Sequence, residues 1–274
     1  MARRTRFSFS RVTTFEQCPR RYRYRYIDGV HEGFVSIEAF MGRQAHSTVE
    51  WMYEERRAGR EPTLDESVAR YCGFWDGALA TERAPVKVVR SGETREDYRR
   101  LGAEMVSDYY RRNFAADALE TIAMERHFTI ELGGRHAFQG YIDRLARDGD
   151  GRVVVIDFKT GKRVPQRFEG KDADQLRAYA LALFADGEGE LELRLEYLRT
   201  GKRVAERIRA DQAGPIEERL AARIDAAEAA TVYPPVPGPL CGWCGFNDVC
   251  EAATSAAPPR RRGRAREGAR PWSA

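Results

Sequence analysis

Two aspartates and a lysine fall at the ends of neighbouring predicted strands, in the segments GYIDR (140–144) and VVVIDFKTGK (153–162). Asp143 belongs to the first segment, and Asp157 and Lys159 belong to the second. Carboxylate oxygens hold Mg²⁺ with several of its waters, and the ion can polarise a phosphate and activate a water. A lysine beside the ion can orient or deprotonate that water. Either aspartate alone would more simply begin a turn, but the three together predict metal-dependent phosphodiester hydrolysis.

The strands that must position these residues are defined by local patterns. Residues 153–156 are an apolar β-branched run between the Asp-Gly-Asp-Gly turn at 148–151 and Thr160-Gly161. Asp157 and Lys159 therefore share one face of the strand, with Phe158 on the other. Residues 121–132 and 135–146 read as two strands joined at Gly133-Gly134. We expect a three-stranded meander over 121–159 with Asp143 on the strand next to Asp157.

These segments belong to a longer ordered series of motifs. The series resembles the PD-(D/E)xK nuclease superfamily in its RecB/AddB-like branch, and it spans residues 7–251. The matching segments are SFSRVTTFEQCPRRYRYRYI (8–27), MGRQAH (41–46), GYIDR (140–144), the run ending in DFKTG (157–161), QLRAYA (175–180) and CGWCGFNDVC (241–250). The chain carries Asp157 where the superfamily permits Asp or Glu, so no core position is degraded.

The resemblance assigns roles to individual residues. It implies that His46, Asp143 and Asp157 are metal ligands and that Lys159 is the catalytic lysine. Gln175 and Tyr179 match the last catalytic motif, and we expect them to position DNA or water from one face of a helix at 172–185. Outside this family, His46 would be a buried histidine bonded to backbone, and Gln175 and Tyr179 would be ordinary packing residues. Glu125 also matches a position where relatives carry an acid, and it ranks below the others.

The resemblance also implies the architecture. We expect an α/β (α+β) fold with a restriction-endonuclease-like core, in which a central mixed sheet is flanked by helices. A helical insertion and a cysteine-cluster staple between the chain ends complete it. The expected segments are an amino-terminal segment with the first cluster cysteine (1–35), a helical region with the His motif (36–120), the nuclease core (121–232), the cysteine segment (233–252) and a basic disordered tail (253–274).

Cysteines form a second candidate site. Cys241, Cys244 and Cys250 stand in a C-x2-C-x5-C cluster, which needs a fourth ligand to close a tetrahedral or cuboidal centre. In the resembled family Cys18 supplies it, and the four residues hold a [4Fe-4S] cluster that staples the chain ends. Zinc is the main competing metal, and free structural thiols are the simplest alternative. Cys72 is expected to be a packing residue, and the odd cysteine count with no secretory signal disfavours disulfides.

Basic residues gather near both ends of the chain. Residues 1–25 carry a net +7 and residues 259–274 a net +5, so the segment between them carries −8 of the overall +4. Attraction for DNA must therefore come from local basic patches. In PRRYRYRY (19–26) the tyrosines could stack on bases or pack inward in a helix. Thr13 and Glu16 fit a capping box that would open this helix and place Cys18 in its first turns.

Composition indicates one soluble catalytic domain. The 274 residues are 42% hydrophobic and 32% charged, with no long apolar stretch and no signal peptide, so we expect a cytoplasmic protein with no membrane partner. The phosphate-binding motif of a helicase motor is absent, so a helicase or a recombination or CRISPR protein would act in trans. The sequence predicts a Mg²⁺- or Mn²⁺-dependent DNA nuclease, an exonuclease on ends or single strands in recombination or repair. Alternatives are a CRISPR-associated adaptation nuclease and a non-catalytic DNA-binding subunit.

Overall fold

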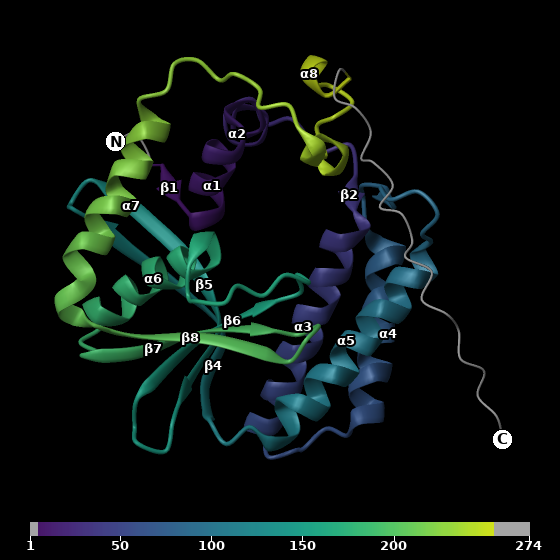
Figure 1. Cartoon of the computed structure of the whole chain (residues 1–274), viewed down its shortest axis with the longest axis vertical. Helices are drawn as coiled ribbons and strands as arrows, with labels where there is room; N and C mark the ends of the chain where they lie inside the picture. The colour runs from purple at the N-terminus through teal and green to yellow at the C-terminus, as the bar shows by residue number, and fades with distance from the viewer. Residues whose placement is uncertain (1–4, 255–274) are drawn as a thin grey trace.

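A six-stranded mixed sheet forms the centre of the molecule (Figure 1). The computed structural model describes residues 5–254. The strands run in the order β1-β5-β6-β7-β8, with β4 paired to β5; β1 pairs with β5 and β6 with β7 in parallel, and the other neighbours are antiparallel. Their bounds are Arg6–Phe7 (β1), Glu120–Leu132 (β4), His136–Arg147 (β5), Val153–Lys159 (β6), Glu190–Tyr197 (β7) and Lys202–Arg209 (β8). The predicted meander and the mixed sheet flanked by helices are confirmed.

Two apolar cores lie on opposite faces of this sheet. On one face, Val153 and Val155 of β6 pack with α1 (Phe9–Gln17), α6 (Gly170–Ala185) and α7 (Ala213–Glu228). On the other face, Val154, Ile156 and Phe158 pack with α3 (Ile37–Arg57) and α5 (Arg95–Arg112). Because alternate residues of β6 enter different cores, the strand is apolar throughout until Asp157.

The helices of the second face form a small bundle. Helix α4 (Leu64–Thr81) packs on α3 and α5, and capping boxes at Thr63 and Thr94 begin α4 and α5. The expected helical region 36–120 thus contains three helices, and α5 ends at Arg112 and is followed by a short 3₁₀ turn, Phe114–Ala116. A two-stranded parallel ladder, β2 (Val35–Ser36) and β3 (Val86–Lys87), joins the start of α3 to the end of α4.

A fully buried arginine ties this bundle to the sheet. Arg144 of β5 has no exposed surface and is ion-paired with Asp117, whose side chain is 3% exposed. Its guanidinium also donates to Thr121 Oγ1 at 3.0 Å and to the carbonyl of Leu119 at 3.2 Å. It lies 3.7 Å from the ring centroid of Tyr53 on α3. Because each group is satisfied, this polar cluster can stand inside an apolar core.

The amino-terminal helices differ from the predicted arrangement. Ser8 caps α1 by accepting from Arg11 N–H, and Thr13 lies inside this helix, where its hydroxyl donates to the carbonyl of Phe9. The predicted capping box of Thr13 and Glu16 is therefore wrong. Cys18 is extended and separates α1 from α2 (Pro19–Tyr26), which begins with Pro19 because proline suits the first helical position.

The tyrosines of α2 serve mainly as packing groups. Tyr22 is 3% exposed, meets Phe15 edge-on at 5.3 Å, and stacks on Tyr233 with the ring centroids 6.2 Å apart. Inward packing is thus the correct interpretation for Tyr22. Tyr26 lies beside it, with the Arg11 guanidinium 4.9 Å from its ring centroid.

The segment after α7 closes the molecule into a ring-like outline (Figure 1). This segment contains a 3₁₀ turn, Pro239–Trp243, and the short helix α8, Glu251–Thr254. It contacts α2 through Tyr24 Oη, which donates to the carbonyl of Val249 at 3.3 Å. It contacts the start of α3 through Trp243 Nε1, which donates to Glu38 at 3.1 Å. The predicted tail begins at the last two residues of α8, and its remainder lies outside the described residues.

Within the described chain, no helix combines the length and the apolar character that a bilayer span requires.

Candidate active site

Asp143 and Asp157 are brought face to face by the pairing of β5 with β6. The register pairs Arg144 with Ile156, so one step further along the ladder Asp143 lies across from Asp157. The backbone N–H of Phe158 donates to Asp143 Oδ2 at 2.8 Å, which fixes this carboxylate to the end of β6. Two acids separated by 13 residues of sequence thus meet through a hairpin whose register was expected from the strand pattern.

Asp143 also stands where the alternation of β5 breaks. Phe138, Ile142 and Leu145 face the core of α6, whereas Ala146 faces the core of α3 and α5. In a regular strand only residues an even number of positions apart share a face. Ile142 and Leu145 are three apart and still face the same core, so the alternation of β5 is interrupted between them. Glu125 lies across from this point on β4 and is the one described non-glycine residue with a left-handed backbone, at φ 46°. Such irregularities re-aim side chains beside functional sites.

Lys159 connects the two strands to helix α6. Its Nζ lies 2.6 Å from Asp157 Oδ2 and 3.6 Å from Asp172, and it donates to Gln175 Oε1 at 3.2 Å. Gln175 Nε2 in turn donates to Tyr179 Oη at 2.9 Å. The structure therefore brings Gln175 and Tyr179 to Lys159, one turn apart on the same helix face.

Glycine at position 140 makes room for Tyr179, which ends the series of hydrogen bonds from Lys159 through Gln175. A Cβ added to Gly140 would lie 2.8 Å from Tyr179 and 2.8 Å from Phe128, distances that side chains do not tolerate. Tyr179 and Phe128 meet edge-on over this gap, with ring centroids 5.2 Å apart. The glycine of the GYIDR segment is therefore a packing requirement rather than a conformational one.

His46 reaches the site from helix α3 on the opposite face. Its Nδ1 lies 3.5 Å from Asp143 Oδ2, and its ring meets Phe158 edge-on at 6.2 Å. Gly42 precedes it by one turn, and a Cβ there would come 3.2 Å from Thr160 Oγ1. Glycine at 42 thus lets α3 approach the end of β6, which explains the Gly-x-x-x-His spacing.

The electrostatics of the site follow from burial and crowded acids. Burial, together with the charge of Asp157, raises the pKa of Asp143 well above its ordinary value. Burial lowers the pKa of His46, so its imidazole is neutral and can ligate a metal. Burial also lowers the pKa of Lys159, but the Asp157 and Asp172 carboxylates outweigh it and leave that pKa above its usual value. Lys159 is therefore a cation at neutral pH.

The residue set suits a hard divalent cation. His46, Asp143 and Asp157 offer nitrogen and oxygen donors, and Asp157 Oδ2 is buried without a hydrogen bond, since its contact with Lys159 lacks hydrogen-bond geometry. Within residues 5–254, however, the ligand atoms of these three residues do not all lie within 4.8 Å of one another. His46 and Asp143 are already close, and Asp157 is drawn toward Lys159.

Glu125 lies next to this site, although from the sequence it ranks below the other candidate residues. Desolvation and the nearby charge of Asp143 raise the pKa of Glu125 to about 7, and Glu50, one turn after His46, adds to this effect. The alignment of Glu125 with Asp143 follows from the hairpin register, which the sequence indicated. Nothing in the sequence indicated that Glu50 belongs near the site, except that it follows His46 by four residues on the same helix.

A second set of three possible ligands lies away from these acids. His136, Asp225 and Glu228 are the one group of histidine, cysteine and acidic residues in the described chain with all ligand atoms within 4.8 Å. The buried His136 ring lies 2.8 Å from Asp225 and 3.5 Å from Glu228, and Arg135 pairs with Asp225 at 3.2 Å. Both ring nitrogens and the carboxylates are thus already engaged, and we assign this cluster to the docking of α7 on β5.

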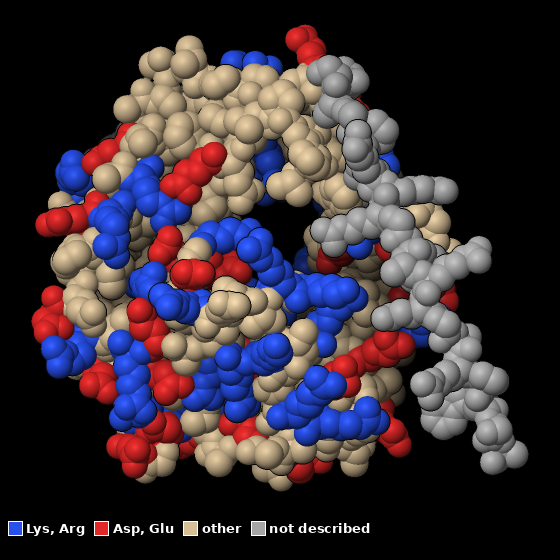
Figure 2. All heavy atoms as spheres, viewed as in Figure 1, with Lys and Arg blue, Asp and Glu red and all other residues tan. Residues whose placement is uncertain are grey.

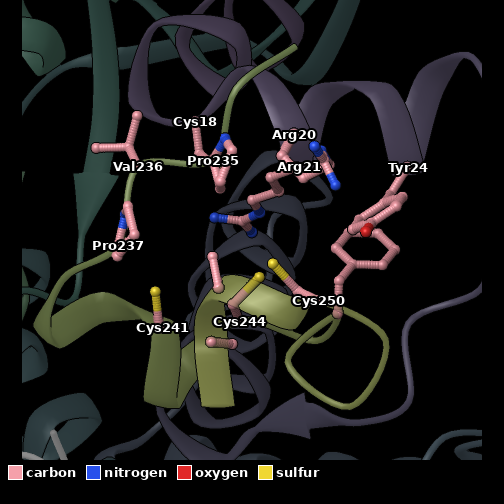
Figure 3. A pocket seen from close by; sticks show the side chains of 13 residues that line it. Cys18, Arg20, Arg21, Tyr24, Pro235, Val236, Pro237, Cys241, Cys244 and Cys250 are labelled. Atoms are coloured by element: carbon pink, nitrogen blue, oxygen red, sulfur yellow. The ribbon is translucent and has the colours of Figure 1, made fainter. Parts of the chain in front are cut away.

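Four cysteines meet in a separate pocket between α2 and the closing segment (Figure 3). Cys18, Cys241, Cys244 and Cys250 line it together with Arg20, Arg21 and Tyr24. Cys72 does not line it and packs against the core of α3 to α5, as expected. The amide of Gly238 donates to Cys241 Sγ at 3.4 Å, and burial raises the pKa of the Cys244 thiol.

Arg21 extends into this pocket toward the cysteines (Figure 3). Its Nε is buried and has no hydrogen-bond partner among the described residues. The residue as a whole is half-buried, and this one nitrogen of its guanidinium is fully covered. Arg21 and the four cysteines thus share one pocket.

Comparison with known proteins identifies the family of this arrangement. The family model of the PD-(D/E)XK nuclease superfamily matches residues 6–251. The crystal structure of SSO0001 is similar in 92% of this chain and 89% of that chain, at 17% sequence identity and a TM-score of 0.38. No curated protein matches. The superfamily match covers the sheet, His46, the two aspartates and Lys159, and the chain belongs to the PD-(D/E)XK nuclease superfamily.

Proposed function

We propose that the protein is a Mg²⁺- or Mn²⁺-dependent deoxyribonuclease that acts as an exonuclease on single strands or DNA ends. The observation that carries this proposal is the meeting of Asp143, Asp157 and Lys159 at the β5–β6 ladder. His46, Asp143 and Asp157 would hold the metal. When bound, the metal supplies a polarised phosphate and an activated water.

The protein residues have distinct tasks in this scheme. Asp143 is held by the Phe158 amide, so its carboxylate is preorganised for a ligand. Lys159 is a fixed cation, which suits it to orient the attacking water and offset charge on the phosphate. Gln175 and Tyr179 position Lys159 through the hydrogen bonds that link them.

A basic loop beside the site supports DNA as the substrate. The loop between β6 and α6 and the first turn of α6 expose Lys162, Arg163, Arg167 and Lys171. Within the described residues, none of these four cations forms an ion pair, whereas many arginines elsewhere do. Unpaired cations directly after the catalytic lysine suit contact with backbone phosphates.

The outline of the molecule supports action on ends or single strands. Figure 2 shows a hollow near the middle of the viewed face, with Lys and Arg side chains along its lower border. The closing segment bounds it because it bonds to both α2 and the start of α3. A closed boundary favours a strand that enters by its end. We place the activity in recombination or repair. A helicase or a CRISPR protein would be the partner in trans.

We further propose that the cysteine pocket holds a [4Fe-4S] cluster. The four cysteines Cys18, Cys241, Cys244 and Cys250 line one pocket, and thiolates suit an iron–sulfur cluster or zinc. Arg21, whose Nε has no hydrogen-bond partner among the described residues, extends toward the cysteines and suits the net negative charge of such a cluster. The cluster would tie α2 to the closing segment and so maintain the closed outline.

End-labelled single-stranded DNA, duplex DNA and RNA, each incubated with Mg²⁺, Mn²⁺ or EDTA, test the proposed activity. We expect metal-dependent shortening of DNA from an end by the wild type, and none by Asp157→Asn or Lys159→Met. Arg83→Gln, an exposed arginine on the loop after α4, is the control and should cleave normally. Cleavage by Asp157→Asn at the wild-type rate would overturn the site, and internal cuts in circular DNA would overturn the exonuclease assignment.

The basic loop has its own test. Lys162→Gln and Arg163→Gln should each reduce the slope of log affinity against log salt by about 0.7 on single strands, the contribution of one phosphate contact. The Arg83→Gln control should leave the slope unchanged. Equal slopes of log affinity against log salt in all three variants would show that this loop does not contact DNA.

A further inference from the structure

An exposed aromatic pair lies on the β4–β5 hairpin beside the candidate active site. Tyr141 of β5 and His127 of β4 are directly opposed in the ladder, and their ring centroids are 4.8 Å apart at an angle of 50°. The residue Tyr141 is 54% exposed and is the one aromatic among the large exposed hydrophobic residues of the described chain. Neither ring forms a hydrogen bond with another described residue.

This pair faces away from helix α6. Its neighbours Gly140 and Ile142 face the core of α6, where Gly140 meets Tyr179, so Tyr141 projects from the other face of the hairpin. That is the face from which His46 of α3 approaches Asp143. Tyr141 is therefore on the same side as the histidine and is uncovered.

Tyr141 also stands at a defined spacing from the metal ligands. It precedes Asp143 by two residues, about 7 Å along an antiparallel strand. This is of the order of the distance between successive phosphates in an extended nucleic-acid strand. A phosphate bound to a metal ion that Asp143 holds would thus bring an adjacent base within reach of Tyr141.

We propose that Tyr141, held by its cross-strand ring contact with His127, is a stacking platform for one nucleobase of the substrate strand. The proposal rests on the proposed function, because the phosphate at Asp143 sets the register. A base is free to stack on Tyr141 only where it is not paired and stacked within a duplex. The platform therefore selects single-stranded DNA or an unpaired end, independently of sequence.

The proposal is tested by binding of a fluorescent single-stranded oligonucleotide and its duplex to the Asp157→Asn protein in Ca²⁺. Tyr141→Ala should weaken single-strand binding about 5- to 150-fold, the range for loss of one stacked base. Duplex binding should change less than twofold. Tyr141→Phe should keep the affinity, and Val232→Ala, which trims a side chain exposed by 76%, is the matched control. Melting curves by circular dichroism establish that each variant is folded.

A second arm uses oligonucleotides with one abasic position moved along the strand. At one position the abasic site should weaken binding to Tyr141 protein and have no effect on Tyr141→Ala, since the base and the ring are lost together. Equal affinity of Tyr141→Ala and the parent, or an equal loss with Tyr141→Leu and Tyr141→Phe, would overturn the platform. Failure of the proposed nuclease function gives a different result: the wild type does not cleave DNA, but its binding still depends on Tyr141.

Discussion

Replacing Arg144 by methionine tests whether the polar cluster under the sheet holds the α3–α5 bundle in place. The change keeps the length of the side chain but removes its charge and its contacts to Asp117, Thr121 and Leu119. Breaking a buried ion pair from one side costs about 3–5 kcal/mol, because the remaining charge stays desolvated. Asp117 retains bonds from Tyr53 and the Leu119 amide, which places the cost toward the lower end.

The expected loss is large enough to measure by thermal unfolding. For a chain of this size, 1 kcal/mol corresponds to about 2–4 °C, so the melting temperature should fall by about 6–20 °C. In the native protein, burial raises the pKa of Asp117, but Arg144 together with the hydrogen bonds from Leu119 and Tyr53 outweighs it and leaves that pKa below its ordinary value. The stability from this pair is therefore fully present above the ordinary pKa of Asp and is lost as pH falls from there through the lower pKa of folded Asp117. In Arg144→Met the acid can protonate, so the deficit should be largest near pH 8 and shrink toward pH 4.

A double-mutant cycle with Asp117→Asn gives the decisive comparison. The double variant should recover part of the loss, because no buried charge remains. Arg83→Gln, an exposed arginine, is the control and should melt within about 0.5 kcal/mol of the wild type. A melting temperature for Arg144→Met equal to that of the control, or a deficit that grows as pH falls, would refute this reasoning.

Three further predictions concern the two candidate sites. Gly140→Ala should cost about 1–3 kcal/mol by overpacking and lower cleavage, since its Cβ displaces Tyr179; normal thermal stability would contradict the close packing. Asp143→Asn should abolish cleavage yet raise stability at pH 7 by about 0.5–2 kcal/mol, because a carboxyl whose folded pKa is raised destabilises the fold above its ordinary pKa; a lower melting temperature would oppose this. Anaerobically purified protein should be brown with absorption near ~400 nm, and Cys18→Ser and Cys244→Ser should lose the iron while Cys72→Ser keeps it; a colourless zinc protein would reject the cluster.

The elements of the nuclease core could be predicted because their signals are local. The apolar run before Asp157, the glycine turn at 133–134 and the alternation of 191–200 each identify a strand from neighbouring residues alone. The spacing of Gln175 and Tyr179 places both on one helix face, and the structure brings them to Lys159. The approach of Asp143 to Asp157 followed from one hairpin register.

Features that depend on distant partners could not be predicted in this way. The burial of Arg144 requires Asp117 and Tyr53, and an arginine read alone is a surface residue. The left-handed backbone at Glu125 could not be predicted, because this conformation is usually adopted by glycine or asparagine and not by glutamate. At the amino terminus two cap patterns overlap, and Ser8 begins the helix five residues before Thr13 because Phe9 and Val12 then reach the core.

The closing contacts of this fold impose an order on its biosynthesis. Strand β1 needs β5 as its partner, and α2 needs the segment that carries Cys241, which follows Cys18 by 222 intervening residues. At about 5–20 residues per second, translation of that interval takes about 10–45 s. During this time α2 and Cys18 have hydrophobic rings and a reduced thiol without their native neighbours. The segment around Cys18 is thus made well before the partners that secure it, and until they are made its exposed rings and thiol depend on chaperones and on a reducing environment.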